Sequence, residues 1–179
     1  MKYNSIADIF TAHIPVRERF LAVTGGISEA EANALPENGG WTAGQIIEHV
    51  AIVEEAMLRI CGKLIGAARE AGRSSDGRFS LTDDFADKAT AVSGVKVDAP
   101  ERVHPTGEVP IAASLDRLAA STAAIEALSG DLGAWDGTDH KFPHPFFGPV
   151  TAAEWLVIRT GHEHRHTNQI ENLLTAVRI

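Results

Sequence analysis

Residues 151–178 read TAAEWLVIRTGHEHRHTNQIENLLTAVR, and this stretch has the pattern of one long amphipathic helix. Thr151 followed three residues later by Glu154 is a capping-box signature, which marks a helix N-terminus. Six side chains spaced three or four apart then fall within about 80° of one another on a helical wheel: Trp155, Ile158, His162, His166, Gln169 and Leu173. The sequence therefore predicts a helix over 151–178 whose core-facing side carries two histidines.

Similar signals upstream predict three further long helices and a short one. Each begins with a capping pair or with a proline suited to a first turn. The predicted helices and their starting residues are 5–24 (Ser5 with Asp8), 28–35 (Ser28 with Glu31), 42–71 (Thr42 with Gln45) and 110–129 (Pro110). Alternation of polar and apolar residues is too scarce to predict a strand, so 130–150 is expected to be a loop.

Four long helices favour an all-α fold, a four-helix bundle. Short links join antiparallel neighbours, whereas a parallel pair requires a long crossover. The connection over 72–109 is long enough for such a crossover. We therefore expect the second and third long helices to run parallel, which gives an up-down-down-up bundle.

Composition excludes several classes of protein. A length of 179 residues fits a single domain spanning 1–179. The single cysteine, Cys61, excludes a disulfide framework and a cysteine-rich zinc module. A net charge of -8 without a basic run argues against nucleic acid or anionic lipid as a partner. With no apolar run of about 18 residues and no signal-peptide pattern, no membrane association is expected, and the predicted location is the cytoplasm.

The paired histidines of the last helix raise the question of a metal. His162 and His166 project from adjacent turns, and an unpaired polar ring buried in a core costs about 1–3 kcal/mol. A divalent ion such as zinc, nickel or iron would satisfy both rings, with His49 of the 42–71 helix as a third ligand. Hydrogen bonding within the core is the alternative explanation for each histidine. His164 is predicted to face solvent, and His13 to lie on the surface.

Residues 162–166, HEHRH, also fit the H-E-x-x-H pattern of zinc proteases. Those enzymes usually take a third ligand from downstream, yet no histidine follows His166. Gln169 stands where the extended protease motif requires glycine. A protease is therefore disfavoured.

Two segments together resemble a known family. Residues 41–50, WTAGQIIEHV, are similar to the W-x(n)-EH segment of the DinB/YfiT-like superfamily, and 161–170, GHEHRHTNQI, to its H-x-x-R-H-x-x-Q segment. The resemblance covers nearly the whole chain. It implies an up-down-down-up four-helix bundle, often a homodimer, with a divalent metal on His49, His162 and His166. Relatives include S-transferases that use a low-molecular-weight thiol, a thiol-dependent maleylpyruvate isomerase and metal-dependent hydrolases.

The expected chemistry follows from a metal with open coordination positions. It either holds a small thiol as thiolate for attack on an electrophile, or lowers the pKa of a bound water for hydrolysis of a small-molecule substrate. A non-catalytic bundle that binds a metal or a small ligand is the third hypothesis. Glu163 is a candidate to reach the metal-bound water, and Gln169 to orient a ligand. Cys61 is expected to be buried, and Glu48 to be solvated.

Overall fold

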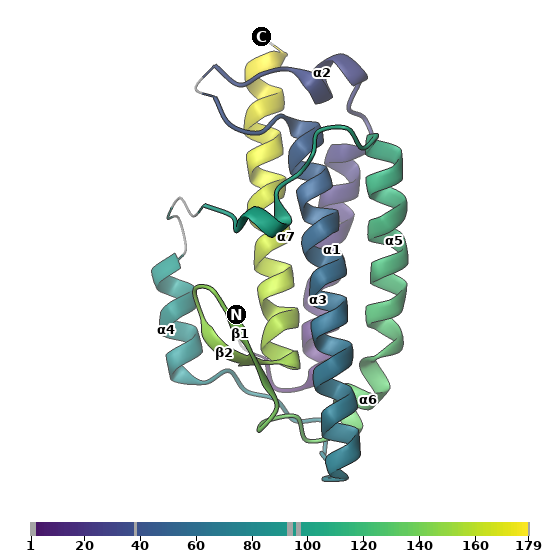
Figure 1. Ribbon diagram of the computed structural model, residues 1–179, viewed down its shortest axis with the longest axis vertical. Helices are drawn as coiled ribbons and strands as arrows, with labels where there is room; N and C mark the ends of the chain where they lie inside the picture. The colour runs from purple at the N-terminus through teal and green to yellow at the C-terminus, as the bar shows by residue number, and fades with distance from the viewer. Residues whose placement is uncertain (1–2, 38, 93–94, 96–97, 179) are drawn as a thin grey trace.

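The bundle consists of four long helices, here described from a computed structural model that covers residues 3–37, 39–92, 95 and 98–178. They are α1 (Ile6–Thr24), α3 (Ala43–Ala71), α5 (Ile111–Ala127) and α7 (Ala152–Val177). In Figure 1, α1 and α7 run upward, while α3 and α5 run downward. The predicted up-down-down-up order is confirmed. None of the helices in the described part of the chain is long and apolar enough to cross a membrane.

The helix starts lie where the capping pairs predicted them. In every predicted box the hydroxyl accepts a hydrogen bond from the backbone N–H three residues on, and the partner side chain accepts from the capping residue's N–H. These capping residues are Ser5, Ser28, Thr42 and Thr151, the second of them opening the short α2 (Glu29–Asn33). At the other end of α3, Gly72 adopts the left-handed conformation (φ 70°), which ends the helix at little cost for glycine.

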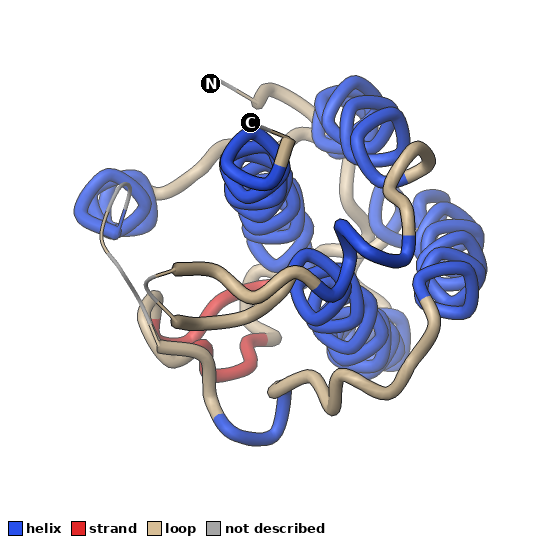
Figure 2. The backbone as a smooth tube through the Cα atoms, turned by 90° about the horizontal axis from the view of Figure 1, so that it is seen from above, coloured by secondary structure: helices blue, strands red, loops and turns tan. Residues whose placement is uncertain are grey.

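The crossover between α3 and α5 holds more structure than the sequence predicted. It contains the helix α4 (Asp83–Val92) and the 3₁₀ turn η1 (Glu101–Val103). Figure 2 shows α4 standing apart from the four long helices. Its buried Phe85 stacks on Phe147 with ring centroids 4.9 Å apart.

The predicted loop over 130–150 is also more ordered than expected. It contains the short α6 (Ser129–Ala134) and an antiparallel hairpin of β1 (Lys141–His144) and β2 (Gly148–Thr151). The expectation that the chain has no strand is therefore wrong. Each strand is only four residues long and contains a proline, so neither shows the alternation that predicts strands.

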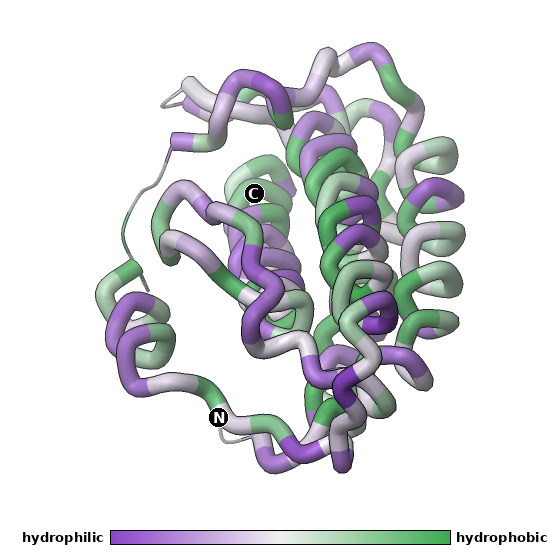
Figure 3. Tube along the Cα trace, turned by 60° about the horizontal axis from the view of Figure 1, so that its bottom comes forward, coloured by the Kyte–Doolittle hydropathy of each residue, from purple (hydrophilic) through white to green (hydrophobic). Residues whose placement is uncertain are grey.

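Hydrophobic and hydrophilic residues alternate along the long helices in Figure 3. The buried apolar side chains form two core clusters. One core cluster surrounds Phe20, Ile46, Leu118 and Ile170, each fully buried. A second surrounds residues such as Met57, Ile125 and Trp155 near the hairpin. Charged and polar side chains are also buried within the bundle, and two groups of them bear on function.

Candidate metal centre

Three histidines meet where α3 and α7 pack antiparallel. His49 lies on the first half of α3, and His162 and His166 lie one turn apart on α7. The Nε2 atoms of His49 and His162 are 3.2 Å apart, and one ring nitrogen from each histidine lies within 4.8 Å of the other two. The sequence thus identified three side chains that the fold brings to one point.

Hydrogen bonds at the outer ring nitrogens orient two of these histidines. His49 Nδ1 donates to the carbonyl oxygen of Val103 in η1 at 2.7 Å. His166 Nδ1 donates to Oε1 of Gln169 at 3.0 Å. A neutral imidazole that donates through Nδ1 carries a lone pair on Nε2. Each of these two rings therefore carries a lone pair on Nε2, the nitrogen that a metal would bind; in His49 this atom lies 3.2 Å from Nε2 of His162.

Burial keeps the three rings neutral. It lowers the pKa of His49, and it lowers the pKa of His166 to about 3, where repulsion between two protonated rings, His166 and His49, adds to the effect of burial. The pKa of His162 lies well below its usual value, chiefly because of burial and also because of the neighbouring His166 and His49. Neutral imidazole is the form that binds a metal, so no proton has to leave these rings at pH 7.

The donor set fits a divalent ion. Zinc–nitrogen bonds are about 2.0–2.1 Å long, so two nitrogens on a tetrahedral zinc lie about 3.3 Å apart. The 3.2 Å between Nε2 of His49 and Nε2 of His162 agrees with this spacing. Three protein ligands leave a further coordination position open, as in catalytic rather than structural zinc sites.

The crossover is fastened to α3 beside the histidines. Glu48 accepts hydrogen bonds from the backbone N–H groups of Thr106 (2.9 Å) and Gly107 (2.8 Å) and from the Thr106 hydroxyl (2.8 Å). It is 1% exposed, so the prediction of a solvated Glu48 is wrong. On a helical wheel Glu48 lies on a different face of the helix from His49. It is buried because the crossover covers that face. Together with the bond from His49 to Val103, this contact fixes the loop next to the site.

Aromatic contacts cover His49 on another side. The ring of Trp41 packs against His49 with centroids 4.7 Å apart and meets His104 edge-on at 5.5 Å. His164 is exposed, as predicted. His144, predicted to lie in a loop, is in β1 and contacts Trp155 at 4.9 Å between ring centroids.

Glu163 belongs to a second group, which sequence reasoning missed. It is 1% exposed, and its carboxylate accepts two hydrogen bonds from Arg17, from Nε at 2.9 Å and from Nη2 at 2.6 Å. Arg17 also pairs with Glu54, which in turn accepts from Arg159 Nη2 at 3.0 Å. Glu163 was expected to reach a metal-bound water, but its carboxylate is instead hydrogen-bonded to the guanidinium of Arg17.

This second group does not suit a metal. His13, Glu54 and Glu163 bring ligand atoms within 4.8 Å of one another. Arg17 and Arg159 already neutralise the two carboxylates, and both guanidinium groups are buried beside them. A dication here would meet two buried positive charges at low dielectric, which costs far more than it gains. The three-histidine group is the metal candidate.

A signal for the missed residues does exist in the sequence. Buried residues of α1 recur three or four apart and include charged and polar ones: Ile6, Ile9, His13, Arg17, Phe20 and Thr24. His13 is 6% exposed, so its predicted surface position is wrong. In α7 the buried residues include Leu156, Glu163, Thr167, Ile170 and Leu174, each one position beyond a residue of the predicted stripe. On the predicted stripe His162 is only half-buried and Gln169 is exposed. The stripe predicted for the last helix was placed about one residue too early, and no stripe was assigned to the first helix, so both lines were missed.

Fold and site define an up-down-down-up bundle with a three-histidine metal candidate between α3 and α7. The chain belongs to the DinB superfamily, which it matches over residues 15–170. Among solved structures it is similar to TT2238, described as a four-helix bundle protein, with a TM-score of 0.62 and 19% identity over 94% of this chain and 99% of that one. No curated protein matches the chain significantly. The structural likeness supports the fold, and the family match covers all three histidines.

Proposed function

We propose that this protein is a metal-dependent enzyme in which His49, His162 and His166 hold a divalent ion. In this proposal the ion activates a low-molecular-weight thiol for attack on an electrophilic small molecule. The supporting observation is the convergence of three neutral imidazoles, two of which are held by hydrogen bonds with Nε2 free to ligate.

The chain's own groups prepare the site. Val103 and Gln169 fix the ring orientation of His49 and His166, and such partners of metal-bound histidines typically change affinity 10–100-fold. A divalent ion bound there would supply a Lewis acid that lowers the pKa of a coordinated thiol or water. The three histidines supply no charge of their own, so the ion keeps its full positive charge toward an incoming anion.

The thiol in this proposal comes from outside the chain. Cys61 is fully buried on α3, and burial raises its pKa to about 12. Its Sγ contacts the carbonyl oxygen of Ala152 at 3.7 Å. A thiol in this state is neither ionised nor accessible, so it does not serve as nucleophile.

A thiol is preferred to water because of where Glu163 lies. A hydrolytic site commonly pairs its metal with a carboxylate general base, and Glu163 is the acidic residue between the two histidine ligands of α7. Its carboxylate is held by Arg17 instead. A coordinated thiol needs no such base, because coordination alone deprotonates it.

Metal content of untagged protein tests the ligand set. Wild type and His164→Ala are expected to retain one divalent ion per chain after purification and reloading. His49→Ala, His162→Ala and His166→Ala are expected to bind it much more weakly at unchanged helical content by circular dichroism. His164 is the matched control because it sits on the same helix and is exposed. Equal metal content in all five proteins would refute the triad.

Activity of the reloaded protein tests the reaction. Bacillithiol, mycothiol and glutathione are each mixed with 1-chloro-2,4-dinitrobenzene, and p-nitrophenyl acetate without thiol reports hydrolysis. Thiol-dependent conjugation that requires metal and His49 supports the transferase. Ester hydrolysis with the same requirements, and no conjugation, would support the hydrolase. Neither activity with any of these thiols, despite a full metal load, would favour a non-catalytic bundle.

A further inference from the structure

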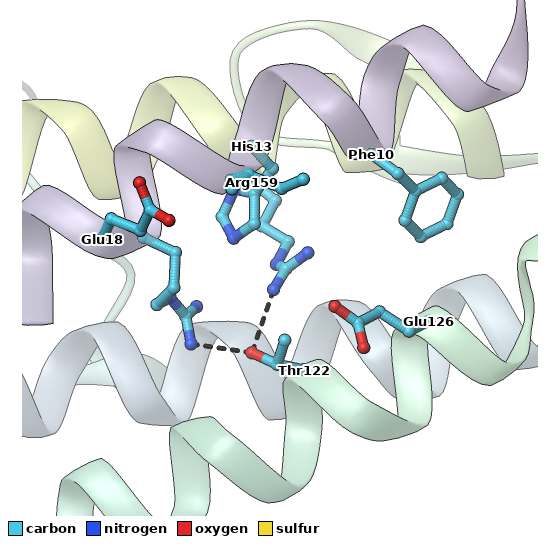
Figure 4. A pocket seen from close by; sticks show the side chains of 8 residues that line it. Phe10, His13, Glu18, Thr122, Glu126 and Arg159 are labelled. Atoms are coloured by element: carbon cyan, nitrogen blue, oxygen red, sulfur yellow. Dashed lines mark hydrogen bonds between the residues drawn. The ribbon is translucent and has the colours of Figure 1, made fainter.

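Three of the eleven arginines form no ion pair in the part of the chain that the structure describes: Arg59, Arg102 and Arg165, all exposed. The other eight each pair with a carboxylate. The buried Arg159, for example, pairs with Glu54 and also donates to the Thr122 hydroxyl, as Figure 4 shows. Two of the three unpaired cations, Arg102 and Arg165, lie beside the three histidines.

Arg165 lies on α7 between the two histidine ligands, three residues after His162 and directly before His166. Its Nη1 donates to the carbonyl oxygen of Val95 at 2.8 Å, which leaves its other N–H groups available. Burial and the neighbouring histidines lower the pKa of His162 and of His166, and the charge of Arg165 adds to both effects. A positive charge is therefore held next to the metal candidate.

Arg102 lies on the crossover, at the point where the crossover is bonded to the site. It belongs to η1 and directly precedes Val103, whose carbonyl oxygen accepts from His49 Nδ1 at 2.7 Å. The adjacent carboxylate, Glu101, is exposed and forms no ion pair with Arg102. The guanidinium of Arg102 is therefore free to bind an anion from solvent.

His144 of β1 adds an uncharged donor near Arg102. Its Nδ1 accepts hydrogen bonds from the backbone N–H groups of Phe146 at 3.2 Å and Phe147 at 3.4 Å, so the proton of the neutral ring is on Nε2. Burial and the charge of Arg102 lower the pKa of His144 to about 4. Its Nε2–H has no hydrogen-bond partner among the described residues.

The hairpin also brings an apolar side chain to this side of the bundle, where Figure 1 shows both the hairpin and η1. Phe146 is 42% exposed, and its ring centroid lies 5.8 Å from that of His144. His144 is itself near enough to His162 to add to the lowering of that pKa, after burial and the closer charges. Cationic, neutral-donor and apolar groups thus surround the half-buried His162.

We propose that Arg102, Arg165 and the Nε2–H of His144 bind the carboxylate of a small apolar acid, the electrophile of the reaction proposed above. A guanidinium presents paired N–H donors that match the two oxygens of a carboxylate. Two unpaired cations favour an anion locally, although the whole protein carries a charge of -8. Phe146 packs against the apolar part of the acid. Low-molecular-weight thiols are polar, so this ring suits the electrophile better than the thiol.

The inference rests on the proposed function for the role of the ligand, but its binding is tested without the metal. Metal-free, ¹⁵N-labelled full-length protein in chelator-free buffer is titrated with benzoate and with benzamide, which has the same shape but no charge. Millimolar benzoate is expected to shift the backbone amides of 101–104 and 144–148. Benzamide is expected to bind at least about fivefold more weakly, because it forms no charge-assisted hydrogen bonds.

S-methylglutathione distinguishes the two possible sources of the carboxylate. It carries the carboxylates of a thiol cosubstrate, but its sulfur is blocked and it has no aromatic ring. It is expected to bind more weakly than benzoate. Binding as tight as that of benzoate would overturn the assignment of this site to the electrophile.

Three matched variants complete the test. Arg102→Gln and Arg165→Gln are each expected to weaken benzoate binding about two- to fivefold, the effect of one exposed ion pair. Arg59→Gln is the control, because Arg59 is exposed on α3 and its charge acts with that of Arg117 to lower the pKa of Glu55. It should leave benzoate binding unchanged.

The proposal is overturned if benzoate shifts none of these amides or if benzamide binds as well as benzoate. It is equally overturned if Arg59→Gln weakens binding as much as Arg102→Gln and Arg165→Gln do. Because the titration uses metal-free protein, a failure of the three histidines to bind a metal would not change these outcomes. The two proposals can therefore fail separately.

Discussion

Replacement of Arg17 by methionine should destabilise the protein far more than replacement of its neighbour Arg19. Arg17 is 9% exposed and lies between the carboxylates of Glu163 (1% exposed) and Glu54 (3% exposed). Methionine has a similar length but no charge, so Arg17→Met leaves a buried carboxylate unpaired. Breaking a buried ion pair in this way costs about 3–5 kcal/mol.

Arg19→Met provides the matched control. Arg19 lies two residues further along α1 and pairs with Glu171 of α7, but both side chains are more than a third exposed. Solvent screening limits such a pair to about 1 kcal/mol or less. The two variants share the helix, the residue type and the substitution. The difference between their unfolding free energies therefore measures the effect of burying the ion pair.

A double variant separates lost charge balance from lost packing. Arg17→Met combined with Glu163→Met leaves Glu54 paired with Arg159 at 3.0 Å, so the interior is balanced again. Replacing a whole buried pair with apolar side chains is often neutral or stabilising. The double variant should therefore recover most of the stability that Arg17→Met loses.

Urea denaturation followed by far-UV circular dichroism at pH 7 measures these differences. A chelator keeps metal binding out of the comparison, because a ligand of the folded state raises apparent stability. With a slope of about 2 kcal/mol per molar urea, a loss of about 4 kcal/mol lowers the midpoint by about 2 M. The reasoning fails if Arg17→Met and Arg19→Met lose the same stability, or if the double variant is no more stable than Arg17→Met.

Three further predictions concern single side chains. The folded pKa of His13 is about 2, so the unfolded state binds its proton first as the pH falls below about 6.5. Between pH 6.5 and 5.0 the unfolding free energy of the wild type should fall by about 1.6 kcal/mol more than that of His13→Gln, as urea denaturation at both pH values can measure. Gln169→Ala should weaken metal binding about tenfold in a chelator competition, because Gln169 bonds to the candidate ligand His166. Asn168→Ala should not, because Asn168 bonds to His164, which is not a candidate ligand. Cys61→Ala should retain the proposed activity, and the native thiol should react with a disulfide reagent only after unfolding.

The parts of the fold that the sequence predicted are those set by local interactions. A capping box involves residues three apart, so Thr42 with Gln45 and Thr151 with Glu154 identify their helix starts without any knowledge of the tertiary structure. The crossover helix α4 is different. Its buried Phe85 packs on Phe147, a residue 62 positions away, so its burial depends on a contact that no local pattern contains.

The candidate site likewise contains residues that a local pattern predicts and residues whose surroundings depend on long-range contacts. His162 and His166 are four apart on one helix, so helical geometry alone places them together. His49 was offered by its place beside the apolar stripe of the second long helix, and the family resemblance supports it. Glu163 was assigned the wrong surroundings because its partner, Arg17, is 146 residues away on α1. The stripe predicted for α7 also ran through His162 and His166, one position away from the buried Glu163, and so left this carboxylate out. The residues of a buried ion pair recur along a helix at the spacing of core residues, but they are charged instead of apolar.

The ion pair also bears on the metal centre, although the two do not share a ligand. Glu163 follows His162 directly and precedes His166 by three residues, so we expect its contact with Arg17 to set the rotation of α7 about its axis. An imidazole nitrogen lies about 6 Å from the axis, so a rotation of about 10° moves it by about 1 Å. Metal sites tolerate only about 0.2 Å. The double variant should therefore keep its stability yet bind the metal more weakly than wild type, and an unchanged affinity in chelator competition would show that core packing alone sets the rotation of α7.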